Sequence, residues 1–312
     1  MSSMHHGPKR DAHSAPISVA SVRQLFARPA RCAPSQFLRR EISARMQERL
    51  GLIKIKPERV LDAACGEGRD LLVLQQTYPE AQLLGVDVAV PMLNIARTTG
   101  IATRSALQTF FARLLGGHRL HSEAVLLGCS DFACLPIPSS SVDLLWSNLA
   151  LHWHPQPHAV IAEWARVLRS DGLLMFSCFG PDTFAELRDV FHTQQMPSRV
   201  LPFVDLHDYG DMLQAAGMAT PVMDMEKITL TYADAGALLA DVRAFGGNPL
   251  HDRPRGLQGR RQWQQILSLL DQRRDRDGRI RLTVEVIYGH AFRPVPRRNS
   301  SGEAIIRFEP RP

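Results

Sequence analysis

Two carboxylates separated by a short loop of small residues are the part of this sequence best suited to hold a ligand. Asp62 comes at the end of an apolar run and is followed by Ala64, Gly66 and Gly68, and Asp87 ends a second apolar run nineteen residues after Gly68. Glycines allow a backbone to approach a ligand closely, and a carboxylate about 20 residues farther along can accept hydrogen bonds from both hydroxyls of a ribose. The spacing predicts a site for a nucleoside-containing cofactor, with these five residues among its contacts.

The charge of Asp62 distinguishes between two cofactors. A dinucleotide-binding loop needs a third small residue where the helix packs on the strand, and Arg69 occupies that position here. A carboxylate at position 62 would also face a pyrophosphate unfavourably, whereas it would attract the sulfonium and ammonium groups of S-adenosylmethionine. S-adenosylmethionine is therefore predicted in preference to NAD.

Residues after the later strands of the pattern complete the predicted cofactor site. Val88 directly follows the second carboxylate and is expected to contact the cofactor. Asp131 is expected to accept a hydrogen bond from the adenine amine and Phe132 to lie on the ring; the alternative is an ordinary turn acid beside a core aromatic. Asn148 and Leu149 leave the fourth strand where the strand order reverses, which is where α/β sheets bind ligands.

The next residues are assigned to the acceptor side of the site. His152 and Trp153 follow the fourth strand, and His152 is either a substrate contact or a structural histidine. A metal site is not predicted from His152, His154 and His158, because prolines interrupt them and no carboxylate or thiol has matching spacing. Cys65 is flanked by small residues and is interpreted as a packing residue, not a nucleophile.

Alternating strand and helix patterns place these residues along one edge of a sheet. Apolar runs bounded by turn residues predict strands, and amphipathic segments predict the helices between them. The predicted strands are 59–63, 81–86, 124–127, 142–147 and 173–178, and the predicted helices are 34–50, 68–77, 91–98 and 156–168. Because strand–helix–strand units are right-handed and pair in parallel, the pattern predicts an α/β fold with a doubly wound parallel sheet.

A different pattern follows residue 180. Two long β-like runs, 222–232 and 280–291, predict an antiparallel pair at one sheet edge, and the helices between them are expected to cap the pocket. The helices predicted in this part are 180–191, with Asp182 as its cap, 206–216, 234–244 and 259–272. Residues 1–20 are predicted to be disordered and 21–312 to form a single domain with an insertion at 99–122.

Composition restricts the class of protein. The 312 residues are 45% hydrophobic and 22% charged, as in ordinary globular proteins, and no apolar run approaches the 18 or so residues that span a membrane. The first 18 residues are rich in His, Pro and Ser and lack the apolar core of a secretion signal. Five cysteines, an odd number placed in or beside apolar segments, indicate reduced thiols and a cytoplasmic location.

Positive charge is concentrated near the carboxyl terminus. Residues 251–312 contain fourteen arginines, no lysine and seven acidic residues, so this segment accounts for the net charge of +6. The arginines either pair locally on the surface or form a docking face for an acidic partner. Nucleic acid is not predicted, because the arginines are not interleaved with aromatic residues for stacking.

Several stretches together resemble a known enzyme family. The chain resembles class I S-adenosylmethionine-dependent methyltransferases and, among them, the malonyl-acyl-carrier-protein O-methyltransferases of biotin synthesis (the BioC family). The matching stretches are 60–68, 135–143, 146–153, 166–168, 172–176, 181–187 and 288–291. The resemblance implies a Rossmann-like class I methyltransferase fold, with a parallel sheet, an antiparallel edge hairpin and a helical cap. One departure is Ala64, which stands where the family has glycine.

The resemblance also implies a reaction. The acceptor would be the free carboxylate of a malonyl thioester on an acidic acyl-carrier protein, which would dock on the Arg-rich 251–312 segment. A carboxylate is ionised at neutral pH, so no catalytic base is assigned. Arg40 and Arg188 are candidates to hold that carboxylate. Mitochondrial complex I assembly factors that hydroxylate an arginine share the stretches 147–153 and 180–188, so hydroxylation of a partner protein, or cofactor binding without turnover, remains open.

Overall fold

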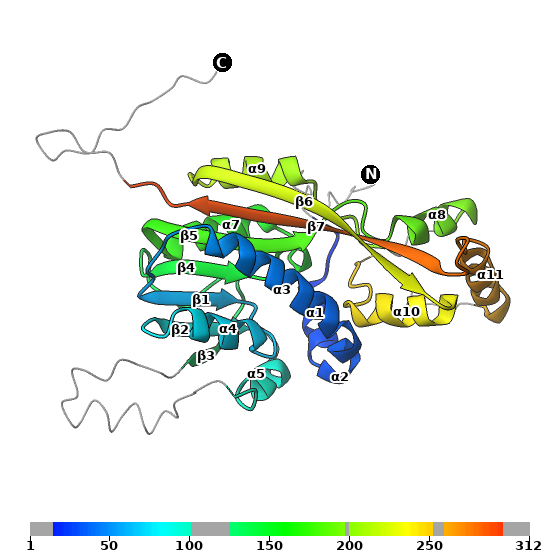
Figure 1. Ribbon diagram of the computed structural model, residues 1–312, viewed down its shortest axis with the longest axis horizontal. Coiled ribbons are helices and arrows are strands. Elements are labelled where there is room, and N and C mark those ends of the chain that lie inside the picture. The colour runs from blue at the N-terminus through cyan, green and yellow to red at the C-terminus, as the bar shows by residue number, and fades with distance from the viewer. Residues whose placement is uncertain (1–14, 101–124, 197–199, 252–258, 296–312) are drawn as a thin grey trace, which may run out of the picture.

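A seven-stranded mixed sheet forms the centre of the protein in the computed structural model, which describes residues 15–100, 125–196, 200–251 and 259–295 (Figure 1). Its order is β3-β2-β1-β4-β5-β7-β6. The strands are β1 (Arg59–Ala63), β2 (Gln82–Asp87), β3 (Leu126–Cys129), β4 (Val142–Ser147), β5 (Leu168–Phe179), β6 (Ala219–Tyr232) and β7 (Ile280–Phe292). β1 to β5 pair in parallel, and β7 is antiparallel to both β5 and β6. The predicted parallel sheet with an antiparallel edge pair is confirmed.

The strand order reverses between β1 and β4, and this creates the place for a ligand. From β1 the chain builds outward through β2 and β3 and then returns to the other side of β1 as β4. Asp62 is paired in register with Gly85 of β2 and with Trp146 of β4. The carboxyl ends of β1, β2 and β4 therefore meet at one edge of the sheet, at the switch point of a doubly wound fold.

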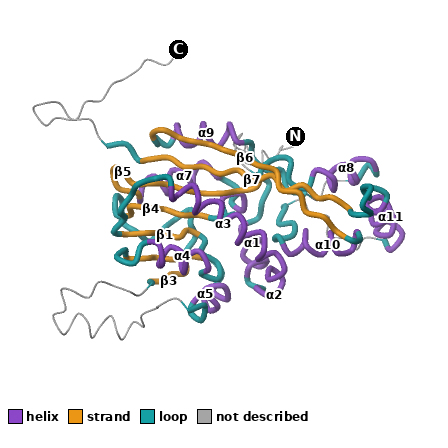
Figure 2. The backbone as a smooth tube through the Cα atoms, in the orientation of Figure 1, coloured by secondary structure: helices purple, strands orange, loops and turns teal. Residues whose placement is uncertain are grey.

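Successive residues of each strand point into two separate cores. Val60 and Leu144 pack on one face with α3 (Gln36–Gly51) and α4 (Arg69–Thr77). Leu61 and Leu145 pack on the other face with α7 (Pro157–Val167) and α9 (Leu206–Ala215). This is the alternation that a strand covered on both faces requires, and Figure 2 shows the helices on both sides of the strands.

Polar contacts with the sheet edge hold α3 in place. Arg45 pairs with Glu226 of β6, which also accepts a hydrogen bond from the hydroxyl of Tyr288 on β7. Arg49 pairs with Asp224 at 2.6 Å, and its guanidinium lies 4.0 Å from the centre of the Tyr288 ring. These contacts fix the helix against the antiparallel strands, and so fix the direction in which its first turn points.

Short helices gather beyond the carboxyl ends of the parallel strands (Figure 1). β6 and β7 are long strands that continue past the parallel part of the sheet toward this group. Its members are α1 (Val19–Phe26), α2 (Pro29–Cys32), the 3-10 helix η1 (Ala33–Ser35), α8 (Ala185–Thr193), α10 (Ala235–Ala244) and α11 (Arg260–Asp271). One further helix, α5 (Val90–Ala96), follows β2 and does not belong to this group.

The structure corrects some of the predicted boundaries. α8 begins at Ala185, so the prediction that Asp182 caps a helix starting near residue 180 is wrong. The backbone N–H of Asp182 donates to Glu285 on β7, and its carboxylate pairs with Lys227. Of the stretch 1–20 that was predicted to be disordered, residues 15–20 are described, and Ile17 there is buried and bridges to Leu250. Most of the predicted insertion at 99–122 lies outside the described residues.

Candidate active site

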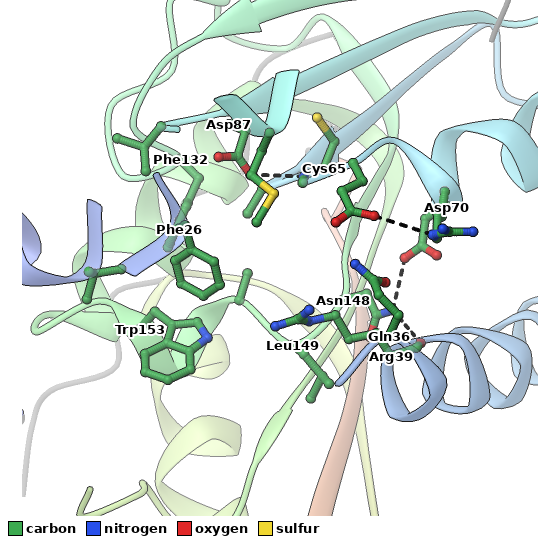
Figure 3. Close-up of a pocket in the computed structure, with 18 of the residues that line it drawn as sticks. Phe26, Gln36, Arg39, Cys65, Asp70, Asp87, Phe132, Asn148, Leu149 and Trp153 are labelled. Atoms are coloured by element: carbon green, nitrogen blue, oxygen red, sulfur yellow. Dashed lines mark hydrogen bonds and ion pairs between the residues drawn. The ribbon is translucent and has the colours of Figure 1, made fainter. Parts of the chain in front are cut away.

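A cavity of roughly 860 Å³, partly open to solvent, lies at the switch point of the sheet (Figure 3). Nine of the predicted site residues line it: Arg40, Ala64, Gly66, Asp87, Val88, Phe132, Asn148, Leu149 and Trp153. Five others are not among its lining residues: Asp62, Gly68, Asp131, His152 and Arg188. Most of the predicted cofactor contacts therefore meet in one cavity.

The loop after β1 turns sharply to open the cavity. Ala64, Gly66 and Gly68 all have positive φ angles, of 70°, 52° and 76°. The N–H groups of Ala64 and Cys65 both donate to the carbonyl oxygen of Val86, at 2.8 and 2.9 Å. A Cβ placed on Gly66 would meet no atom within 4 Å, so the glycine leaves open space in front of the loop that a ligand can occupy.

Asp87 is positioned by the backbone on both sides of it. The N–H of Gly66 donates to its Oδ2 at 2.9 Å and the N–H of Ala89 to its Oδ1 at 2.8 Å. Burial raises the pKa of this carboxyl group, and the N–H donors oppose the shift. Each oxygen retains acceptor capacity, because an ionised carboxylate has about four lone-pair sites. The side chain can therefore accept from a diol while it stays fixed in place.

Asp62 lies beneath the loop with an unsatisfied oxygen. It is 1% exposed, and its Oδ2 has no hydrogen-bond partner. Burial raises its pKa well above the usual value, and Asp70 and Asp87 raise it further. Three acidic side chains so close together favour a positively charged ligand, because a cation would relieve their mutual repulsion.

Asn148 is held in a single orientation at the cavity wall. Its Nδ2 donates to Asp70 Oδ2 at 3.0 Å and to the carbonyl oxygen of Arg39 at 3.1 Å. Its Oδ1 accepts from the Ser177 hydroxyl at 2.9 Å, and Trp146 Nε1 also donates to Asp70. Asp70 was not predicted as a site residue, because an acid in the first turn of a helix is explained by the helix dipole alone.

Arg39 is the main residue of the cavity that the sequence pattern did not identify. Its guanidinium points into the cavity in Figure 3, between Trp153 and Asn148. Burial lowers its pKa, and the negative charges of Glu67 and Asp87 oppose that shift. Gln36, Arg39 and Arg40 all line the cavity, and their spacing of three and four residues places them on one face of α3. That spacing could have indicated from the sequence that Arg39 lies on the same face of the helix as Arg40.

Comparison with known proteins identifies the family. Residues 61–176 match the family described as "Methyltransferase domain". The chain is 46% identical over 277 residues to the malonyl-[acyl-carrier protein] O-methyltransferase of Laribacter hongkongensis, covering 88% of this chain and 89% of that protein. It is 42% identical over 293 residues to the protein of the same name from Gallionella capsiferriformans, covering 93% and 96%. The chain belongs to the malonyl-[acyl-carrier protein] O-methyltransferase family.

Solved structures confirm the architecture. A putative methyltransferase from Bacillus halodurans superposes with a TM-score of 0.53 at 16% identity, covering 81% of this chain and 99% of that one. The YcgJ protein of Bacillus subtilis gives a TM-score of 0.50 at 18% identity, covering 77% and 93%. This similarity shows the fold alone. The methyl donor of the O-methyltransferase family is S-adenosylmethionine, and the orphaned Asp62 and the open space at Gly66 fit its charge and shape.

Ala64 is where this family member departs from the usual glycine loop, and its conformation allows a test. A non-glycine residue at φ 70° costs roughly 1–2 kcal/mol, of which the freer unfolded chain of a glycine variant offsets about 0.4–1 kcal/mol. Ala64→Gly is therefore expected to raise the free energy of unfolding by about 0.5–1 kcal/mol in urea titrations. A loss of stability would show that the methyl group makes a compensating contact.

The acceptor-side residues take different positions. Trp153 lines the cavity and meets the Phe26 ring edge-on, with centroids 5.6 Å apart. His152 is 5% exposed, and its Nδ1 accepts from the N–H of Phe179 at 3.3 Å. Arg188 donates to the carbonyl oxygens of Thr183 and Pro181, outside the cavity.

Burial of His152 predicts a pH dependence of stability. Burial lowers its pKa from 6.5 to about 3, so between these values the unfolded chain binds the proton and the folded protein does not. Stability should therefore fall as the pH drops below about 6.5, by up to about 1.4 kcal/mol per pH unit. Urea unfolding at pH 7, 6 and 5 should show a shallower decline for His152→Gln, which keeps an acceptor for the Phe179 N–H. Equal slopes in the two proteins would contradict a buried neutral histidine.

Two further residues of the predicted site lie beside the cavity. Asp131 accepts from the N–H of Ala133 through its Oδ1 at 3.0 Å, and its neighbour Phe132 lines the wall. Gly68 is the N-cap of α4, behind the loop.

Within the described residues there is no cluster of three side chains that could hold a metal ion, and none of the described helices is long and apolar enough to cross a membrane.

Proposed function

We propose that this protein transfers a methyl group from S-adenosylmethionine to the free carboxylate of a malonyl thioester carried by an acyl-carrier protein, as a step of biotin synthesis. The observation that carries the proposal is the distribution of charge in one cavity. Asp70 and Asp87 line one part of it, with Asp62 buried close to both, whereas Arg39 and Arg40 line it from α3. A cationic donor and an anionic acceptor can be bound together in such a cavity.

The donor is assigned to the acidic side. Asp87 accepts from the ribose hydroxyls, Phe132 lies against the adenine, and the Asp131 carboxylate, beside Phe132, accepts from its amine. The loop at Gly66 and Gly68 provides the close approach that the donor requires. Support comes from the fixed Asp87 carboxylate and from the placement of Phe132 in the cavity wall.

The remaining donor contacts come from the loops after β1, β2 and β4. Asp62 attracts the positively charged methionyl part from beneath the loop. Ala64, Val88, Asn148 and Leu149 shape the wall around it. S-adenosylmethionine bound there supplies an electrophilic methyl group.

The acceptor is assigned to the arginine side. Arg39, which is deeper, and Arg40, which is exposed at the rim, pair with the malonyl carboxylate and leave one oxygen free. Phe26 and Trp153 exclude water from that oxygen, and alignment in a dry site accounts for catalysis without a base. Arg188 is expected to stabilise the 181–183 loop instead of holding substrate, because its guanidinium is already used by backbone carbonyls.

Labelled methyl transfer tests the proposal directly. The protein is incubated with methyl-labelled S-adenosylmethionine and malonyl-carrier protein, with acetyl-carrier protein as the control that lacks a free carboxylate. A base-labile labelled ester on the malonyl carrier alone is expected. A partner protein that gains the mass of one oxygen, with no ester formed, would support arginine hydroxylation instead. The methyltransferase names of the relatives, at 42–46% identity over most of the chain, favour methyl transfer.

Docking of the acidic carrier on the Arg-rich 251–312 segment needs arginines that are not already engaged. Within the described part of this segment, five arginines bind acidic side chains or carbonyl oxygens: Arg273, Arg274, Arg279, Arg281 and Arg293. Arg260 and Arg261 are the first residues of α11 and are exposed, so this helix is the best-supported docking element.

Five free cysteines are consistent with a cytoplasmic reaction.

A further inference from the structure

A second, inner pocket adjoins the cofactor cavity across Trp153, which lines both. Its volume is roughly 360 Å³, including space open to solvent. All of its described lining residues are apolar side chains or glycine, among them Phe179, Phe203 and Phe245. An uncharged group can occupy this pocket next to the reacting centre, whereas an ion would lose its hydration without compensation.

An outer groove continues from the inner pocket to the surface. It lies among α2, α8, α10 and α11, which are neighbours in Figure 1, and it shares Leu187, Val242 and Gly247 with the inner pocket. Its described walls carry Arg31 and Arg243 but no carboxylate. The Arg243 guanidinium lies 4.8 Å from the centre of the Trp263 ring, which supports it in a defined position.

Glycines form the junction between these spaces. Gly246 and Gly247 have positive φ angles of 131° and 67°. A Cβ on Gly246 would lie 2.4 Å from Cη2 of Trp153. Any side chain at position 246 would therefore displace the indole that separates the inner pocket from the cofactor cavity. The backbone here is adapted to the position of Trp153.

We infer that the outer groove, the inner pocket and the arginine side of the cofactor cavity form one binding route for an acyl thioester on a phosphopantetheine arm. The inference rests on the proposed function and adds how the acceptor enters. Such an arm carries a phosphate at its outer end, an uncharged middle and, when malonylated, a carboxylate at its inner end. The route presents Arg31 and Arg243, then apolar walls, then Arg39 and Arg40. The order of charges on the protein is complementary to that on the ligand.

Charge reversal at the groove tests the route. Arg243→Glu is compared with the wild type on malonyl-carrier protein and on a short malonyl thioester that lacks the phosphate. The ratio of the two KM values is expected to rise about tenfold at low salt and to shrink as salt is added. Lys54→Glu is the charge-reversal control, because Lys54 is exposed just before β1, at the opposite end of the parallel strands, and lies outside both the groove and the Arg-rich 251–312 segment.

Narrowing the passage gives a second, independent readout. Val242→Trp places a large side chain at the boundary of groove and inner pocket, and is expected to lower kcat/KM for malonyl-carrier protein at least tenfold while the Kd for S-adenosylmethionine changes less than twofold. If the wild type turns over normally, an unchanged KM ratio in Arg243→Glu, or an equal change in Lys54→Glu, overturns the route alone. Absence of ester from both substrates in the wild type overturns the proposed function and the route with it.

Discussion

Asp87→Asn weakens binding of S-adenosylmethionine by roughly 30- to 140-fold, because an amide cannot accept from both ribose hydroxyls. The loss corresponds to about 2–3 kcal/mol for one hydrogen bond to a charged group, plus the unpaired donor left behind. The substituted side chain can still accept the N–H of either Gly66 or Ala89, so the loop should keep its course. Titration calorimetry measures the change in Kd.

The matched control for this change is Asp189→Asn. Asp189 is exposed on α8, where it pairs with Arg273, and does not line the cavity. Its variant should bind the cofactor as the wild type does. Equal affinity of Asp87→Asn and the wild type would remove Asp87 from the cofactor site.

Arg39→Gln lowers kcat/KM for the malonyl carrier by roughly 100-fold or more. Removal of one partner of a buried charge pair costs about 3–5 kcal/mol, and the Arg39 guanidinium is placed in the cavity between the acidic edge and Trp153. Steady-state kinetics at saturating cofactor give the change in KM. The Kd for S-adenosylmethionine should stay within about threefold of the wild type, since the acidic residues are unchanged.

Variants of three other arginines serve as controls for this prediction. Arg40→Gln, at the exposed rim, should reduce kcat/KM by no more than about tenfold, as for a solvated ion pair. Arg23→Gln on α1 and Arg188→Gln outside the cavity should leave KM unaltered. A large rise in the Kd for cofactor with an unchanged KM would assign Arg39 to the donor instead of the acceptor.

The cofactor side of the fold could be predicted from sequence because its signals are local. β1, the loop through Gly66 and β2 lie within one short stretch, and the hydrophobic pattern and turn residues there act on nearest neighbours. Asp87 ends its strand in register with the loop that it binds. The positive φ of Ala64 could not be predicted from its residue type, because alanine rarely adopts it. The loop nevertheless forms with alanine at the position of its first glycine.

The acceptor side depends on contacts between distant parts of the chain. Arg39 reaches the cavity from α3, which packs on the sheet through its apolar residues and is tied by Arg45 and Arg49 to β6, more than 170 residues later. The helix predicted to begin near Asp182 starts later because Glu285 binds the backbone N–H of that residue. The hydrophobic periodicity of α3 and of the segment after Asp182 does not reveal these distant partners. Tertiary contacts therefore determine the structure there, against the local pattern.

Calorimetric titration of the wild-type protein with S-adenosylmethionine and with its demethylated product tests the cofactor cavity most directly. Saturable binding of both is expected at one site per chain, and Asp87→Asn should weaken both together. No heat and no thermal stabilisation with either compound would contradict the cofactor cavity, and with it the methyl transfer that depends on it.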